Sequence, residues 1–436
     1  MAQPRGDLRR TRRIRWLVLV IPSAIYFFSY FHRVASAVVA ADVMRAFAIS
    51  AAALGSLTAV YPYVFVAMAL VAGSLAETLG PRRTLALGGF GMGVGAVVFG
   101  AAPLFGVAVL GRILVGVGAS VVLISFLSLA AEWFRPDEFA TVSGLTQTVG
   151  NIGGLIAASP LAVLVEAVGW RPSFLIIGGV TLLFGAASLL FVRDRPEAMG
   201  LAPVNPPRPR HALTLGEVVR GIPEMAANPR TWPPIVAASG MFATLIAVQG
   251  LWGVSYLTQI YGLTRVEAAN LTSLLAVGII VGAPLIGRLS DQWLGARRLP
   301  FVAFGALYTA CWLPLAVPGW RLPLPFLAPF FFVMGFASCG LVLLWSCVRE
   351  VNNPARIGIV IGFSNMPVFL GLALLQWLTG VVLDAGWQGA SAGGVRVYPA
   401  SAYEAAFAVC LVVSVVALLA TLRVTETRCR NVWGGR

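Results

Sequence analysis

The chain has 436 residues, of which 58% are hydrophobic and only 11% are charged. A soluble domain carries about 25% charged residues, so this composition excludes an ordinary soluble fold and places most of the chain in lipid. The formal net charge is +14, and every basic residue other than the two histidines is an arginine. These arginines lie between apolar runs, which indicates membrane topology and disfavours nucleic-acid binding.

Twelve apolar runs are long enough to cross a bilayer as helices, which takes about 20 residues each. The ninth run is short and ends at Pro318-Gly319-Trp320. A cleaved signal peptide is a poor interpretation of the first run, because that run is too long and His32-Arg33 interrupts it. In chain order we expect spans at 16–40, 51–76, 84–104, 106–133, 139–166, 172–192, 233–260, 267–289, 299–317, 323–348, 356–383 and 402–423.

A polar stretch at 193–231 divides six runs from six, and its segment Thr214–Ala226 has the pattern of a surface helix. We therefore expect an all-α integral membrane protein, with twelve transmembrane helices in two pseudo-symmetric six-helix bundles. Because arginines gather in the tails and in alternate loops, the positive-inside rule predicts cytoplasmic termini, in the plasma (inner) membrane. The expected parts are a tail at 1–15, a bundle at 16–192, a cytoplasmic linker at 193–231, a bundle at 232–424 and a tail at 425–436.

The sequence offers nothing that indicates a cofactor, a metal ion or catalysis. There is no Gly-x-x-x-x-Gly-Lys motif for a nucleotide. Four of the five cysteines lie within expected spans, and their spacing predicts neither a disulfide framework nor a metal site. We expect a protein that is not an enzyme and needs no cofactor; the cysteines are Cys311, Cys339, Cys347, Cys410 and Cys429.

One short motif occurs twice, each time between two apolar runs and half a chain apart. The first copy reads Gly73-Ser-Leu-Ala-Glu77-Thr-Leu-Gly80-Pro-Arg82-Arg83. The second reads Gly287-Arg-Leu-Ser-Asp291-Gln-Trp-Leu-Gly295-Ala-Arg297-Arg298. This duplication predicts that the second half of the chain repeats the first.

Two further pairs of segments support the repeat. Glu166-Ala-Val-Gly169-Trp170 matches Asp384-Ala-Gly386-Trp387, and Gly144-Leu-Thr-Gln147 matches Gly362-Phe-Ser-Asn365. Their near-constant offset makes Asn365 the counterpart of Gln147.

The duplicated motif resembles the signature loop of the major facilitator superfamily, and the resemblance extends over nearly the whole chain. It implies two bundles that rock about a central site and expose it to each side of the membrane in turn. It also implies a conformational latch, in which the acid caps a helix or pairs with an arginine. A purely topological loop is the alternative, and Glu77 in place of the usual aspartate lengthens the first arm. The latch residues are Gly73, Glu77, Gly80, Arg82, Arg83, Gly287, Asp291, Gly295, Arg297 and Arg298.

The fourth run contains Gly111-Arg112-Ile-Leu-Val-Gly116-Val-Gly118, which resembles a second motif of the same superfamily. The resemblance implies a gating role for Arg112. A charge inside a membrane is costly, so we expect Arg112 to have a partner or a water path. The alternative is that its long side chain reaches the outer surface.

Arg33 is the main candidate for substrate binding. Tyr26, Tyr30 and Arg33 have helical spacing and share one face. Tyr30-Phe-His32-Arg33 resembles the Tyr-x-x-Arg start of the organophosphate permeases and related organic-anion transporters, and this implies that Arg33 grips a phosphate or carboxylate. The alternatives are a structural arginine paired with an acid such as Asp42, or one that reaches the outer surface.

Polar residues on other spans complete the expected site. Gln249, Trp252 and Tyr256 share a face of the seventh run, where the organophosphate permeases carry a second arginine; a single arginine suits a carboxylate better than a phosphate. Gln147 and its counterpart Asn365 are further candidates, although amides within spans often only join helices. His32 occupies the position of a proton-carrying acid in some relatives, and its role is equally a proton switch or packing.

These features predict a secondary active transporter of a small organic anion, either a carboxylate or a phosphate ester. The alternatives are a proton-coupled exporter of drugs or metabolites, and a non-transporting membrane sensor derived from a permease. The expected partners are the anionic substrate, protons or a counter-anion, and the lipid bilayer. We expect a monomer that binds no nucleic acid.

Overall fold

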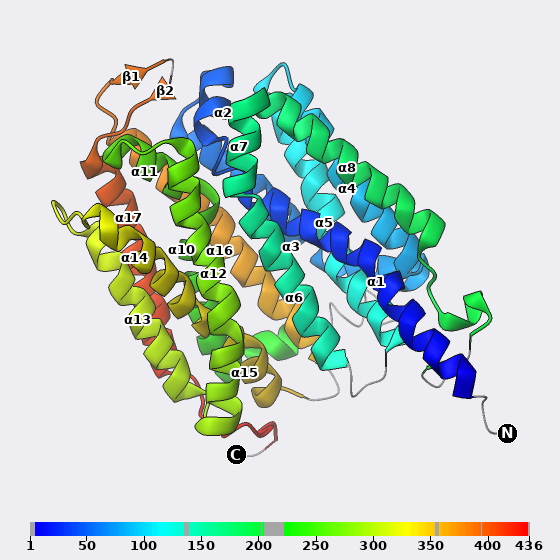
Figure 1. The fold of residues 1–436 in the computed structure, drawn as a ribbon. Coiled ribbons are helices and arrows are strands. Elements are labelled where there is room, and N and C mark those ends of the chain that lie inside the picture. The colour runs from blue at the N-terminus through cyan, green and yellow to red at the C-terminus, as the bar shows by residue number, and fades with distance from the viewer. Residues whose placement is uncertain are drawn as a thin grey trace. The chain divides into compact units, whose positions relative to one another are not determined.

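The computed structural model describes residues 5–134, 139–201, 203–204, 222–353, 357–393 and 395–434. Nearly all the described residues are helical (Figure 1). The α-helices are α1 (Arg5–Val34), α2 (Ala40–Phe47), α3 (Ala51–Thr78), α4 (Pro81–Ala101), α5 (Phe105–Trp133), α6 (Phe139–Ile156), α7 (Ser159–Val168), α8 (Trp170–Phe191), α10 (Trp232–Ala247), α11 (Gly253–Tyr261), α12 (Arg265–Arg288), α13 (Arg298–Ala316), α14 (Leu324–Ser338), α15 (Leu343–Val351), α16 (Ile357–Ala385) and α17 (Ala400–Leu422).

Short elements join these helices. Two are π-helices that continue a longer helix, η3 (Val248–Trp252) and η4 (Leu289–Trp293). Three are 3-10 turns, η1 (Pro196–Met199), η2 (Pro229–Thr231) and η5 (Cys339–Val342). The strands β1 (Ser391–Ala392) and β2 (Val395–Arg396) form an antiparallel hairpin with Ser391 opposite Arg396.

Twelve stretches among the described residues are long and apolar enough to cross a membrane, which confirms the predicted all-α membrane fold. Most boundaries lie within a few residues of the sequence prediction, and two differences are larger. The first span ends at Val34 instead of residue 40, because the chain turns there and starts the separate helix α2. The predicted span 139–166 breaks between α6 and α7, where Pro160 lacks the N–H that a continuous helix needs. The predicted helix Thr214–Ala226 lies mostly outside the described residues.

Contacts divide the chain into two compact units. Unit 1 comprises residues 1–32, 67–154 and 168–216, and unit 2 comprises 33–66, 155–167 and 217–436. Unit 2 therefore contains α2, most of α7 and the first part of α3 together with all of the second six spans. The division into bundles at 16–192 and 232–424 stays a prediction.

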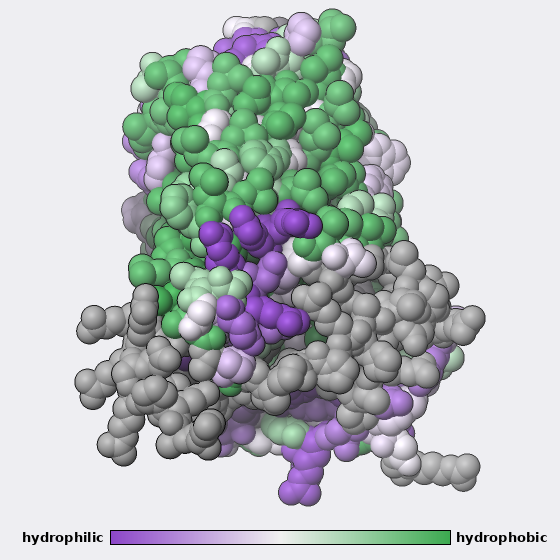
Figure 2. Space-filling model, turned by 90° about the vertical axis from the view of Figure 1, so that its right-hand side faces the viewer, coloured by the Kyte–Doolittle hydropathy of each residue, from purple (hydrophilic) through white to green (hydrophobic). Residues whose placement is uncertain are grey.

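Much of the molecular surface is apolar, as membrane burial requires. Figure 2 shows one face covered mainly by hydrophobic side chains, with hydrophilic ones gathered toward its lower part. The described helices expose leucine, valine and phenylalanine at levels that water would not tolerate, for example Leu183, Leu190, Phe191 and Val412.

Glycines allow several helix pairs to approach closely. In unit 2, α12 meets α14 at two such points: a Cβ on Gly335 would lie 2.1 Å from the carbonyl oxygen of Leu275, and one on Gly278 would lie 2.2 Å from that of Phe332. In unit 1, Gly88 and Gly118 face each other's helices in the same way. Small residues at such contacts let backbones pack without a hydrophobic driving force.

Gly335→Ala should therefore destabilise the protein by about 1–3 kcal/mol, because the new methyl group has backbone atoms in its way. Thermal unfolding of the purified protein measures this. Gly179→Ala is the matched control, since nothing lies within 4 Å of a Cβ there. Equal melting temperatures for the two variants would contradict the packing described for α12 and α14.

Candidate functional site

Arg33 lies against a wall of aromatic rings inside unit 2. Its guanidinium carbon is 5.4 Å from the centre of the Phe369 ring, 5.7 Å from that of Tyr61 and 6.0 Å from that of Phe65. Phe65 stacks on Phe369 at 4.3 Å, and Phe242 contacts Phe369 at 5.8 Å. We call Tyr61, Phe65, Phe242 and Phe369 the aromatic wall. Rings attract a guanidinium through their faces, more strongly where water is excluded, and Tyr61 is only 1% exposed.

The wall is built by three helices. Tyr61 and Phe65 are one turn apart on α3, Phe242 lies on α10, and Phe369 lies on α16. On α16, Asn365 lies one turn before Phe369 and Gln376 two turns after it, so all three share one face. The predicted residue Asn365 is thus placed on the helix face that Arg33 approaches.

The seventh span departs from a regular helix at the predicted site residues. The π-helix η3 adds a residue to the turn, which changes the direction of the side chains that follow. Trp252 donates a hydrogen bond from Nε1 to the Thr379 hydroxyl of α16 at 2.9 Å. Tyr256 instead packs against Tyr403 and Phe407 of α17. Trp252 and Tyr256 therefore contact different helices, whereas Gln249 is buried within η3.

The remaining predicted side chains belong to unit 1. The rings of Tyr26 and Tyr30 are 5.3 Å apart, edge to face. His32 is fully buried between phenylalanines, and neither of its ring nitrogens has a hydrogen-bond partner among the described residues. Its proton-switch role stays a prediction. The Gln147 side chain lies outside the described residues.

Arg112 also lies inside unit 1. It is 3% exposed and donates a hydrogen bond from its guanidinium to the carbonyl oxygen of His32 at 2.9 Å. It does not reach a surface, so the alternative of a snorkelling side chain does not apply. The acid Asp42, considered as a partner for Arg33, lies 2.8 Å from Arg265 in unit 2.

Helices α3 and α16 touch closely where α3 begins and α16 ends. A Cβ on Gly55 would lie 2.5 Å from the carbonyl oxygen of Gln376, and one on Gly380 would lie 2.5 Å from that of Ala51. The Asp384 carboxylate accepts hydrogen bonds from the backbone N–H groups of Ala51 (3.0 Å) and Ala52 (2.7 Å). It thereby caps α3 with a negative charge at the positive end of the helix dipole.

The β1–β2 hairpin reinforces this contact. Asp384 also accepts a hydrogen bond from the Tyr398 hydroxyl at 2.9 Å and forms an ion pair with Arg396 at 3.1 Å. Gln259 accepts from the Tyr398 amide at 3.0 Å and so attaches the segment after the hairpin to α11. We call the contact of α3 with α16 at Ala51, Ala52, Gly55, Gln376, Gly380 and Asp384 the hairpin-end contact.

Asp384→Asn should loosen the start of α3, because a neutral amide accepts weaker hydrogen bonds than a carboxylate does. Charge-assisted hydrogen bonds contribute about 1.5–3 kcal/mol each, so amide exchange at Ala51 and Ala52 should accelerate about tenfold or more. Hydrogen exchange followed by mass spectrometry measures this. Glu404→Gln is the control, since Glu404 accepts only an exposed bond from Gly319. Unchanged exchange in Asp384→Asn would exclude the cap.

The second copy of the signature loop forms a buried charge network in unit 2. Arg297 donates to both oxygens of Glu350, at 2.7–3.1 Å, and also to Asp291 and the Ser290 hydroxyl. Arg297 and Glu350 are each only 4% exposed. Arg298 is exposed, and Gly287 has open space around it. Gly295 has a φ of +54°, which allows the turn.

The C-terminal tail completes this network. The Glu426 carboxylate accepts from the amides of Arg297 and Arg298, at the start of α13. Burial alone would raise the pKa of Glu426, but these backbone hydrogen bonds hold the pKa below its usual value. Thr427 donates to Glu350, and the amide of Val432 donates to the Glu350 carbonyl at 2.7 Å. The tail is therefore attached to the loop by side chains and backbone together.

The first copy is arranged differently in unit 1. Asp194 accepts from the Arg82 amide at 2.7 Å and caps α4, as Glu426 caps α13. The Arg82 side chain, however, donates to the carbonyl of Leu189, and Arg83 is exposed. Gly80 has a φ of +83° and packs on Asp194. Gly73 and the Glu77 side chain lie outside the described residues.

Glu132 is the counterpart of Glu350 in the first half, because these two residues have the same separation in the sequence as Glu166 and Asp384. It pairs with Arg195 at 3.7 Å, and these side chains are 38% and 40% exposed. Among the described residues, both halves thus have a carboxylate that caps a helix. The Arg297–Glu350 pair of the second half is buried, whereas the Glu132–Arg195 pair of the first half is exposed.

Glu350→Gln should destabilise the protein by about 3–5 kcal/mol, because it leaves the buried Arg297 without its main charge partner. Glu132→Gln is the matched control and should cost at most about 1 kcal/mol, since its pair is exposed. Thermal unfolding of the two variants measures the difference. If both variants melted alike, the buried network would have no special role in holding the second loop.

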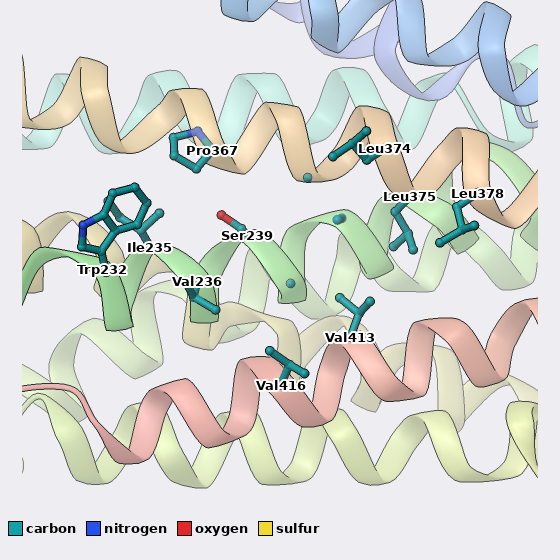
Figure 3. A pocket seen from close by; sticks show the side chains of 13 residues that line it. Trp232, Ile235, Val236, Ser239, Pro367, Leu374, Leu375, Leu378, Val413 and Val416 are labelled. Atoms are coloured by element: carbon teal, nitrogen blue, oxygen red, sulfur yellow. The ribbon is translucent and has the colours of Figure 1, made fainter. Parts of the chain in front are cut away.

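An apolar pocket of about 340 Å³ lies elsewhere in unit 2, among α10, α16 and α17 (Figure 3). None of the predicted substrate-binding residues lines it. Its one hydroxyl is that of Ser239, and its rim residues Val236, Leu374 and Val416 are exposed apolar side chains. A pocket of this kind suits an apolar chain and offers no charge to an organic anion.

The sequence did not single out Phe65 and Phe369, which lie beside Arg33, or the buried Gln376 on the same face of α16 as Phe369. The aromatic residues gave no signal, because aromatic side chains in spans are mostly packing. Gln376 had one, since it is an amide in the middle of the apolar run from Met366 to Leu378.

Comparisons with known proteins agree with this fold. A family model described as the Major Facilitator Superfamily matches residues 23–375 and, a second time, 239–431. A probable sulfoacetate transporter of Cupriavidus necator is 24% identical over 288 residues, 65% of this chain and 67% of that protein. The membrane sensor protein UhpC of Salmonella typhimurium is 24% identical over 377 residues, 82% of this chain and 83% of that protein. A probable hexose phosphate transport protein of Chlamydia trachomatis is 24% identical over 285 residues, 60% and 61% respectively.

A solved structure supports the fold. The bacterial homologue of the human lysosomal transporter Spinster, in an inward-facing and unoccupied conformation, has a TM-score of 0.73 and 19% identity. The match covers 94% of this chain and 97% of that one. At this identity the likeness establishes the arrangement of helices and nothing about the substrate.

Proposed function

Because this chain belongs to the major facilitator superfamily, we propose that it is a secondary active transporter that moves a small organic anion across the membrane by alternating access. The observation that carries the proposal is Arg33, a guanidinium held against the aromatic wall within apolar helices. Ionisable residues inside membrane spans are costly and mark substrate or ion pathways.

The chemistry of Arg33 favours a single acidic group. A guanidinium presents planar N–H donors that match two oxygens of one carboxylate or phosphate, and sulfonate oxygens have comparable spacing. In this proposal the anion binds the N–H groups of the guanidinium, while the rings attract its positive charge. The names of the relatives fit this chemistry, since one is a probable sulfoacetate transporter and another a probable hexose phosphate transport protein.

The hairpin-end contact supplies a gate for this transporter. The Phe65–Phe369 stack extends this contact from Asp384 toward the middle of α3 and α16. The two helices therefore meet along about 20 Å. Opening this gate separates the Phe65–Phe369 stack and releases the cap on α3. An anion at Arg33 favours closure, because neutralising the guanidinium makes it less costly to exclude water from the wall.

Arginine placement gives the orientation. The tails and the linker carry most of the arginines, so we place both termini in the cytoplasm of a plasma (inner) membrane protein. The hairpin-end contact then lies at the outer side, and the two signature loops at the inner side. There the Arg297 network acts as the latch, with Arg112 as a gating residue of the other half.

A membrane sensor is the second candidate, favoured by the likeness to UhpC over 82% of the chain. A sensor would bind the same anion at Arg33 without moving it. Uptake into proteoliposomes distinguishes the two, because a transporter accumulates or exchanges the anion that stabilises it, whereas a sensor is stabilised without uptake.

Arg33→Ala should weaken binding of the transported anion about ten- to hundredfold, as the loss of charge-assisted hydrogen bonds predicts. The measurement is the rise in melting temperature of purified protein with sulfoacetate, hexose phosphates and small carboxylates, together with uptake in proteoliposomes. Arg33→Lys should recover only part of the affinity, since an ammonium lacks the planar fork.

Arg45→Ala is the control for Arg33, because Arg45 is an exposed arginine in α2 and its loss should leave binding unchanged. If apolar or cationic compounds stabilised wild type and Arg33→Ala equally, and no anion did so selectively, the anion transporter would be excluded in favour of an exporter.

A further inference from the structure

Gln376 carries a buried amide with an unused hydrogen-bonding atom. The residue is 3% exposed, and its Oε1 has no hydrogen-bond partner among the residues that the structure describes. Buried polar atoms are almost always paired, and an unpaired one costs free energy. A buried amide oxygen without a hydrogen-bond partner in the proposed gate therefore needs a physical explanation.

Gln376 lies between the aromatic wall and the hairpin-end cap. On α16 it follows Phe369 by two turns, about 10 Å, and precedes Thr379 by one turn. The carbonyl oxygen of Arg33 lies 3.7 Å from where a side chain on Gly250 would begin, and nearby Trp252 bonds Thr379. Arg33 therefore lies near Gly250 at its backbone and near Phe369 at its guanidinium, and Gln376 is on the same face of α16 as Phe369.

We propose that Gln376 binds a hydroxyl group of the transported anion while Arg33 holds the anion's acidic group, so that the protein selects small hydroxycarboxylates or hydroxysulfonates. This inference rests on the proposed function of Arg33. A hydroxyl is the group that satisfies a glutamine amide in either orientation, because it donates to the oxygen and accepts from the nitrogen. An anion that lacks the hydroxyl leaves the amide unpaired.

The same arrangement couples recognition to the gate. A Cβ on Gly55 would touch the backbone of Gln376, so this buried residue belongs to the contact of α3 with α16. Without substrate, closure leaves Oε1 unpaired and is opposed. A hydroxy-anion removes that cost and neutralises Arg33 in one binding event, so it closes the gate better than its deoxy analogue does.

The test is competition in proteoliposome uptake with matched pairs of anions: glycolate against acetate, lactate against propionate, and 2-hydroxyethanesulfonate against ethanesulfonate. Wild type should bind the hydroxy member of each pair about three- to tenfold better, as one neutral hydrogen bond predicts. Gln376→Leu should bind both members equally, with the affinity for the deoxy member retained.

Ser239→Ala is the matched control. The Ser239 hydroxyl is also buried without a partner among the described residues, but Ser239 lines the apolar pocket, which none of the predicted substrate-binding residues lines (Figure 3). This variant should keep the wild-type preference. Gln376→Met, which has an unbranched side chain, is measured beside Gln376→Leu so that a folding defect in one does not end the test. Both variants should melt no lower than wild type without ligand, because each removes an unpaired buried amide.

Two results would overturn the inference. One is a wild type that does not prefer hydroxy-anions, and the other is a preference that survives in Gln376→Leu and Gln376→Met. In both cases the proposed function still holds if anions compete for uptake in wild type and Arg33→Ala abolishes that competition. If no anion competes at all and Arg33→Ala behaves as wild type, the proposed function itself fails.

Discussion

The need to keep a guanidinium inside an apolar bundle is the constraint on which the site depends. A charge in a membrane span is costly, although Arg33 lies in the last turn of α1 and not at its centre. The rings of Tyr61, Phe65 and Phe369 offset part of this cost through their faces. The wall in turn requires α3 and α16 to stay close, which Gly55 and Gly380 allow. In the proposed function, this guanidinium beside the aromatic wall is where the anion binds.

The same contact links distant parts of the chain. Asp384 joins the start of α3 to the end of α16 and to the hairpin, and Asp42 joins α2 to Arg265 of α12. Each link is polar and of the kind that can be made and broken at modest cost when water enters. By contrast, the Arg297–Glu350 pair is buried and tied to the tail. The second signature loop is therefore held to its own half by a buried ion pair and by the tail.

Much of the fold could be predicted from the sequence, because twelve apolar runs and a duplicated loop leave few alternatives. The break before Pro160 and the early end of the first span depended on local turns that hydropathy does not show. The candidate site was harder. Arg33 stood out because a charge in a span is rare, but its aromatic neighbours come from helices far along the chain. The π-helix at Val248–Trp252 could not be predicted from hydropathy, nor could the different partners of Trp252 on α16 and of Tyr256 on α17.

In the proposed mechanism, an anion at Arg33 controls closure of the contact between α3 and α16. The most direct measurement is the distance between spin labels at Ser56 and Ala385, which are exposed near that contact, in a background without the partly accessible Cys429. Adding the transported anion should shift the distance distribution toward the short, closed population, and Arg33→Ala should abolish the shift. A distribution that no transported anion changes, or that responds equally in Arg33→Ala, would contradict the account.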